Sequence, residues 1–215
     1  RGLQGQAVKS VSIVGAGRLG TVLGAALARC GWRVEAVFDM DARAARESRR
    51  IIGQGRATTD IRGPAKAGAV VFLTVPDDEV GRAAARLARA PGPWAGRTVF
   101  HTSGLLPAKV LEPLRKRGAA VASPHPVQSF PDKTAPARIF KGVTWGVEGD
   151  AAAVRTAEGT VKDLRGHILL LSEKDKRLYH AAGWELPTNP VTAGSAARLL
   201  PANILVHGVH VDAAG

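Results

Sequence analysis

The chain has 215 residues, 45% of them hydrophobic and 22% charged, which is the composition of an ordinary globular protein with one or two domains. The apolar stretches are far shorter than a membrane span, and residues 1–10 carry no secretory signal, so we expect a cytoplasmic protein. The single cysteine, Cys30, excludes an internal disulfide framework and a zinc site built from cysteines.

The chain is strongly basic, with a formal net charge of +12. A charge of this size invites a nucleic-acid hypothesis. The arginines, however, are spread through Ala-rich segments such as 41–51 and 81–90, with no basic tail, and aromatic residues make up 5% of the chain. We therefore favour a solvated, arginine-rich surface over a polyanion-binding one and expect no nucleic-acid partner. The positive field would also attract a phosphorylated cofactor.

Strands and helices alternate through residues 9–118. Short apolar runs rich in β-branched residues predict buried strands at 9–14, 32–39, 68–75 and 97–103. Apolar side chains at helical spacing, bounded by Gly or Pro, predict helices at 19–30, 41–51, 78–90 and 107–118. Such alternation is typical of βαβ units, so we predict a doubly wound, mostly parallel α/β sheet. Beyond Gly118, three shorter strands are expected at 119–130, 141–149 and 167–173.

A glycine-rich turn stands between the first predicted strand and the first predicted helix. Gly15, Gly17 and Gly20 form a Gly-x-Gly-x-x-Gly pattern, and Asp39 follows 19 residues after the last glycine. This context is that of the Rossmann dinucleotide fingerprint, in which the helix N-terminus binds the pyrophosphate. A glycine-rich turn without a ligand is the alternative. The cofactor-binding residues predicted in the turn are Gly15, Ala16, Gly17, Arg18, Leu19 and Gly20.

Asp39, at the end of the second predicted strand, bears on the choice of cofactor. A carboxylate there accepts hydrogen bonds from the adenosine ribose and would repel a 2′-phosphate, which favours NAD. Arg43 and Arg46 could instead neutralise such a phosphate, so NADP stays open. Asp39 could also serve as the N-cap of the next helix.

The third predicted strand ends beside the expected cofactor crevice. Thr74, Val75 and Pro76 are expected to line it, because ligands bind at the carboxyl ends of parallel strands. The acids that follow are expected to complement the dipole of the next helix rather than to act in catalysis. These acids are Asp77, Asp78 and Glu79.

Six segments occur in an order that resembles a known family: "SIVGAGRLG", "VVFLTVPDDEV", "VFHTSG", "SPHPVQSF", "GVEGD" and "RLYHAA". They are similar to the Rossmann-like oxidoreductases that carry a C-terminal domain of unknown function numbered 2520. These are relatives of the 6-phosphogluconate, ketopantoate, pyrroline-carboxylate and prephenate dehydrogenases. The resemblance implies an NAD(P)-binding domain at 9–122, further strands and a substrate loop at 123–172, and the start of a smaller helical, dimer-forming domain at 173–215.

The resemblance ends after Ala182. Pro187, Pro190 and Pro201 would interrupt the long helices that the family places there. We therefore interpret 183–215 as a truncated or frame-shifted tail, with a divergent but genuine end as the alternative.

Hydride transfer needs a group that can donate or accept a proton close to the cofactor. His125 lies between two prolines, and a similar His-Pro pair occurs near the active site of the prephenate dehydrogenase relatives. Gln128 and Ser129 follow in the same loop. Ser103 stands at the carboxyl end of the fourth strand, and His101 points to the same face. Each of these residues could instead serve a turn or the packing of the core.

Two predictions concern histidines nearer the C-terminus. His180 is a third catalytic candidate, because in the family its helix faces the substrate cleft; a histidine with a structural role on that helix is the alternative. His207 and His210 have a metal-like spacing but lack a carboxylate partner, so we expect no metal site.

The sequence thus predicts an NAD(P)-dependent oxidoreductase acting on a small anionic metabolite, of the keto or imino acid class. A dinucleotide-binding sensor without turnover, an inactive truncated copy, and a nucleic-acid-binding protein are the alternatives.

Overall fold

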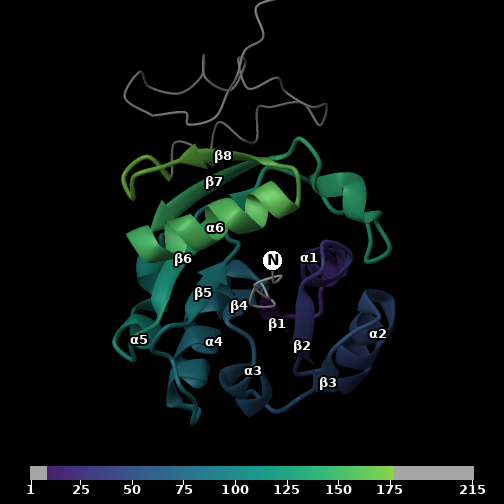
Figure 1. The fold of residues 1–215 in the computed structure, drawn as a ribbon. Helices are drawn as coiled ribbons and strands as arrows, with labels where there is room; N and C mark the ends of the chain where they lie inside the picture. The colour runs from purple at the N-terminus through teal and green to yellow at the C-terminus, as the bar shows by residue number, and fades with distance from the viewer. Residues whose placement is uncertain (1–8, 177–215) are drawn as a thin grey trace, which may run out of the picture.

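A continuous eight-stranded sheet runs through residues 9–176, the part of the chain that the computed structural model describes (Figure 1). The strands stand in the order β3-β2-β1-β4-β5-β6-β7-β8. Their bounds are Ser10–Val14 (β1), Arg33–Phe38 (β2), Arg56–Thr58 (β3), Val70–Leu73 (β4), Thr98–His101 (β5), Ala120–Pro126 (β6), Thr144–Gly149 (β7) and His167–Leu170 (β8). The helices are Arg18–Arg29 (α1), Ala42–Ile52 (α2), Arg62–Lys66 (α3), Asp77–Arg89 (α4), Glu112–Arg115 (α5) and Ala151–Asp163 (α6), with 3₁₀ turns at Ala108–Leu111 and Ala137–Phe140.

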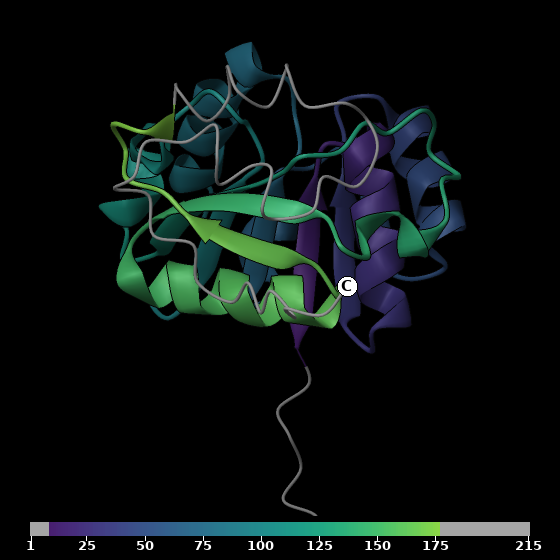
Figure 2. The same cartoon turned by 90° about the horizontal axis from the view of Figure 1, so that it is seen from above.

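The pairing of the strands confirms the expected doubly wound, mostly parallel sheet. All the strand pairs formed among β1 to β6 are parallel. Strand β7 then pairs antiparallel with β6, and β8 pairs parallel with β7. The chain reaches β8 through α6, which lies along β7 and β8 on the same side of the sheet as α1 (Figure 2).

Both faces of the sheet are covered, and this explains why the central strands lack an apolar–polar alternation. One apolar cluster joins α1, α2 and α6 to the sheet and includes Leu23, Leu27 and the fully buried Trp145. The other joins α3, α4 and α5 to the opposite face and includes Leu87 and Trp94. The result is a three-layer α/β/α arrangement.

The structure differs from the predicted elements between residues 107 and 118. In place of one helix, the 3₁₀ turn Ala108–Leu111 is followed by the short helix α5. Pro113 has no N–H to donate to the carbonyl of Lys109, four residues earlier, so an α-helix cannot continue through it. The Lys109 carbonyl accepts from the N–H of Glu112 instead, which is a 3₁₀ bond. Strand β3 and helix α3 are additions that the sequence pattern did not predict.

The predicted division of the chain stays a prediction. The boundary at 122 falls inside β6, within the continuous sheet. His180 and the whole of the segment 183–215, with the expected start of a helical domain, lie outside the described residues. Within residues 9–176, no helix has the length and apolar character needed to cross a membrane.

Candidate functional site

Close packing around the glycine turn requires glycine at two of its three positions. Gly15 has a φ of +110°, and a Cβ there would lie 2.7 Å from the Thr74 carbonyl oxygen. A Cβ on Gly20 would lie 2.1 Å from the Gly15 carbonyl oxygen and 2.4 Å from Thr74 Oγ1. The turn, helix α1 and the end of β4 can therefore approach one another only because these two side chains are absent.

Gly17 differs from Gly15 and Gly20, because a Cβ added there would meet no atom of residues 9–176 within 4 Å. It is the N-cap of α1, no side chain caps this helix, and its first turn contains no acidic residue. The open position at Gly17 therefore lies at the helix end where uncapped N–H groups and the positive end of the helix dipole are found. This is the space that the pyrophosphate of a dinucleotide needs, so the residues present fit that group.

Asp39 connects the end of β2 to the glycine turn. Its Oδ2 accepts from the N–H of Ala16 at 2.8 Å, and its Oδ1 accepts from the N–H of Asp41 at 3.0 Å. The N-cap of α2 is Asp41, whose side chain accepts from the N–H of Arg43 at 2.8 Å. The alternative interpretation of Asp39 as the helix cap was therefore wrong, because the cap residue lies two positions later.

The end of β4 lies directly against the same turn. The Thr74 N–H donates to the Val14 carbonyl and Thr74 Oγ1 donates to the Gly15 carbonyl, both at 2.8 Å. Val75 and Pro76 continue this edge into α4. The acids Asp77, Asp78 and Glu79 stand in the first turn of α4, as a dipole-complementing role requires.

A row of buried polar side chains crosses β5, β6 and β7 near the carboxyl end of β5. Ser123 pairs with Glu148 in the β6–β7 ladder, and His101 ends the adjacent strand β5. His101 is fully buried, and its Nε2 lies 3.2 Å from the Pro107 carbonyl oxygen. Burial, together with Lys176 and His125, lowers the pKa of His101 to about 3, so the ring is neutral.

Ser103 is held in the turn that follows β5. Its N–H donates to His101 Nδ1 at 3.2 Å, and its Oγ accepts from the N–H groups of Leu105 and Leu106 at 3.2 and 3.0 Å. The hydroxyl thus makes the backbone contacts of a turn serine. Neither of these contacts uses the hydroxyl proton.

His125 lies next to this turn on β6. Its Nδ1 is 3.0 Å from the carbonyl oxygen of Thr102. Since a carbonyl can only accept, Nδ1 carries a proton, and Nε2 is the ring nitrogen that can gain or lose one. Gln128 and Ser129 are exposed on the loop that follows, and this loop approaches α1 where Arg18 Nη1 lies 3.5 Å from the Pro131 carbonyl oxygen.

Three members of the polar row were missed by the sequence reasoning: Ser123, Glu148 and Lys176. Lys176 is 1% exposed, its Nζ lies 3.7 Å from Glu148 Oε1, and it also donates to Ser123 Oγ. Burial lowers the pKa of Lys176 to about 8, and Glu148 opposes this shift. An acid within the otherwise apolar strand 144–149 was the available signal, because buried carboxylates need partners.

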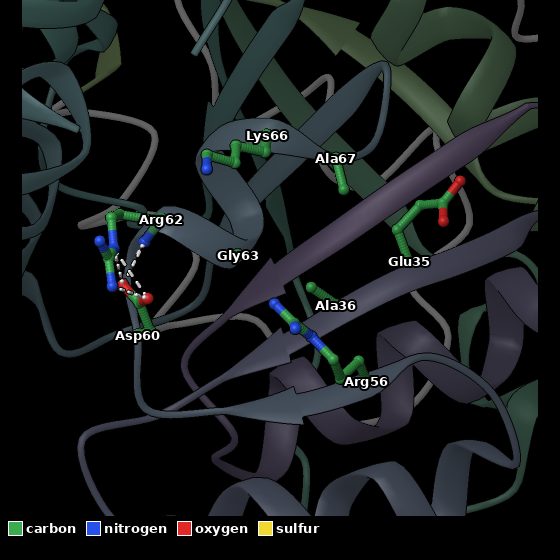
Figure 3. A pocket seen from close by; sticks show the side chains of 8 residues that line it. All are labelled: Glu35, Ala36, Arg56, Asp60, Arg62, Gly63, Lys66 and Ala67. Carbon is green, nitrogen blue, oxygen red and sulfur yellow. Dashed lines mark hydrogen bonds and ion pairs between the residues drawn. The ribbon is translucent and has the colours of Figure 1, made fainter. Parts of the chain in front are cut away.

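A pocket of about 520 Å³ opens elsewhere, between α3 and the strands β2 and β3 (Figure 3). Arg62 pairs with Asp60 at 2.7 Å at one end of it, and the hydrogen bond from Arg62 lowers the pKa of Asp60 to about 2. None of the predicted site residues within 9–176 lines this pocket. Its lining residues are Glu35, Ala36, Arg56, Asp60, Arg62, Gly63, Lys66 and Ala67.

A family model of the Rossmann-like domain matches residues 2–126, which is more than half of the chain. The chain belongs to the Rossmann-like domain family. None of the curated proteins compared with this Rossmann-like chain matches it.

Solved structures of low sequence identity share the fold of this Rossmann-like chain. A Bacteroides fragilis protein, provisionally designated an NADP oxidoreductase, has a TM-score of 0.70 at 20% identity over 82% of this chain and 65% of its own. Protein TM1727 from Thermotoga maritima has a TM-score of 0.62 at 24% identity, over 80% of this chain and 61% of its own. Prephenate dehydrogenase from A. aeolicus, solved in complex with hydroxyphenyl propionate and NAD+, has a TM-score of 0.66 at 17% identity, over 80% of this chain and 63% of its own. The chain thus spans less than two thirds of the length of each.

Proposed function

We propose that this chain is an NAD(P)-dependent oxidoreductase that transfers a hydride to or from a small anionic metabolite, of the keto or imino acid class. The observation that carries the proposal is the open position at Gly17, the N-cap of α1. The protein leaves open space above an uncapped helix N-terminus, although Gly15 and Gly20 are packed against backbone. Structural neighbours designated NADP oxidoreductase, prephenate dehydrogenase and pyrroline-5-carboxylate reductase support the same reaction class.

In this proposal residues Gly15 to Gly20 hold the pyrophosphate, and Thr74, Val75 and Pro76 line the crevice. The bound nicotinamide supplies or receives the hydride. Asp39 favours NAD, because a carboxylate at the end of β2 would repel a 2′-phosphate. The six segments from "SIVGAGRLG" to "RLYHAA" resemble oxidoreductases with the domain of unknown function 2520, and this resemblance supports the same class of reaction.

His125 is proposed to exchange a proton with the substrate. Its Nδ1–H is held by the Thr102 carbonyl, which orients the ring and makes Nε2 the atom that accepts or delivers the proton. Ser103 is proposed to donate its hydroxyl proton to a substrate oxygen or nitrogen. His180, which lies outside the described residues, is a third candidate. His101 is unsuited to this role, because it is fully buried and neutral.

The test is the thermal stability of the chain with NAD+, NADH, NADP+ and NADPH. A ligand at about 100 times its dissociation constant adds about 2.7 kcal/mol to the stability of the folded state. We expect the larger shift with the NAD pair. Gly17→Ala should keep the melting temperature of the free chain but lose the shift, because the added methyl group occupies the pyrophosphate space.

Gly159→Ala is the matched control, since a Cβ at this α6 position also meets no atom within 4 Å. It should keep the full cofactor shift. A cooperative melt that none of the four dinucleotides changes at millimolar concentration would refute the proposal. Binding without any substrate-dependent change in nicotinamide absorbance would favour a sensor.

A further inference from the structure

Lys176 and Glu148 form a buried ion pair that neither the glycine turn nor the proposed proton transfer uses. Both side chains are at least nine-tenths buried, and Glu148 Oε1 also accepts from the N–H of Ala108. Two charges removed from water are stable only when they are paired and hydrogen-bonded. The pair lies beside the candidate catalytic residues, since Lys176 Nζ donates to Ser123 Oγ on β6.

The direction of these hydrogen bonds follows from the chemistry of the ammonium group. A lysine ammonium can only donate, so Ser123 Oγ accepts from it, and the hydroxyl proton must be directed away from Lys176. Two acceptors are in reach of that proton, the Ser103 carbonyl oxygen at 3.2 Å and His101 Nδ1 at 3.4 Å. Lys176 therefore fixes the orientation of the Ser123 hydroxyl toward the turn that follows β5.

That turn is the support of His125. Ser103 N–H donates to His101 Nδ1, and the Ser103 carbonyl accepts from Ser123, so Ser103 is held from two sides. The Thr102 carbonyl, one peptide away, accepts from His125 Nδ1. The contacts thus run without a break from Lys176 through Ser123 and Ser103 to the carbonyl that sets the tautomer of His125.

We propose that Lys176, held by Glu148, is a positioning residue that fixes the Thr102–Ser103 turn and, through it, the proton-carrying nitrogen of His125. This inference rests on the proposed function of His125. The contacts it invokes can nevertheless be measured in the full chain with no cofactor present, so the two proposals can fail separately.

The experiment compares amide hydrogen exchange in the wild-type chain, Lys176→Met and Ser123→Ala. Exchange at the amides of Ser103, Leu105 and Leu106 should become at least tenfold faster in both variants, relative to amides of the central strand β1. Lys174→Met is the matched control, because Lys174 is exposed two residues away and should leave these amides unchanged. The ¹⁵N spectrum of His125 should change from one tautomer to a mixture in Lys176→Met and Ser123→Ala alone.

If Lys176→Met fails to fold, Ser123→Ala still tests the proposal, because Ser123→Ala removes one hydroxyl and leaves the ion pair between Lys176 and Glu148 in place. Unchanged exchange at the three amides would overturn the proposal. A uniform acceleration across β1 and the turn, with the His125 tautomer unaltered, would also overturn it, because that result indicates a general loss of stability. Failure of the dinucleotides to stabilise the wild-type chain would instead refute the proposed function.

Discussion

Mild acid should weaken the fold through His101 at the end of β5. The ring is fully buried, and its pKa is lowered to about 3, chiefly because burial penalises the charged imidazolium. In the unfolded chain the same group titrates near its ordinary value of about 6.5. Between these pH values the unfolded chain binds a proton that the folded chain does not. Stability from this group is therefore lost as the pH falls through that window.

The size of the effect follows from the two pKa values. Each unit of difference corresponds to about 1.4 kcal/mol. Between pH 7 and pH 5 the unfolded imidazole becomes almost fully charged, while the folded ring stays neutral, so the loss is about 2 kcal/mol. Between pH 7 and pH 3 the loss grows to about 4 kcal/mol.

The assay is urea unfolding at pH 7 and at pH 5 for the wild-type chain, His101→Gln and His167→Gln. Gln at position 101 retains a donor for the Pro107 carbonyl but cannot be protonated, so this variant should lose about 2 kcal/mol less than wild type on acidification. His167 is exposed on β8, and its variant should behave like wild type. Equal losses in wild type and His101→Gln would refute the reasoning, since the other titrating groups are common to both.

Three further substitutions test the packing and capping described above. Gly20→Ala should destabilise the fold by about 1–3 kcal/mol, because its Cβ would collide with the backbone. Thermal unfolding should show this loss, and Gly17→Ala, measured in the same way, should unfold like wild type. Arg97→Lys should lower the free energy of unfolding in urea by about 2–4 kcal/mol, because one ammonium cannot replace a guanidinium that donates to four backbone carbonyls. These carbonyls belong to Pro64, Ala65, Ala67 and Gly68. Asp41→Ala should cost about 1 kcal/mol in a circular dichroism melt by removing the cap of α2, and an unchanged melting temperature would contradict that role.

The parts of the fold that the sequence predicted are those with strong local signals. Long apolar runs and bounded helical periods located the central strands and the helices α1, α2 and α4. Strand β3 has three residues, none of them buried, and α3 has five with a proline among them, so neither carries a period that a sequence pattern can show. The split of the segment 107–118 was foreseeable in principle, because Pro113 lies inside the predicted helix.

The candidate site was predictable where one short segment contains it. The glycine turn is such a segment, and the structure shows how each of its glycines is surrounded. The polar row is different, because His101, Ser123, Glu148 and Lys176 come from four separate segments. Only the strand register and the path of the chain after β8 bring them together. Ser103, His101 and His125 could be singled out from their own segments, but Ser123 and Lys176 could not.

The uninterrupted sheet has a mechanical consequence. Five residue pairs join β6 to β7, so the part of the chain with the glycine turn and the part with Glu148 are bound edge to edge and cannot rotate as two bodies about a hinge. Opening between them would break a buried ladder. Among residues 9–176, a ligand that needs more room must displace the loops after β5 and β6. Structures with and without ligand should therefore superpose strand for strand and differ at 102–107 and 127–143.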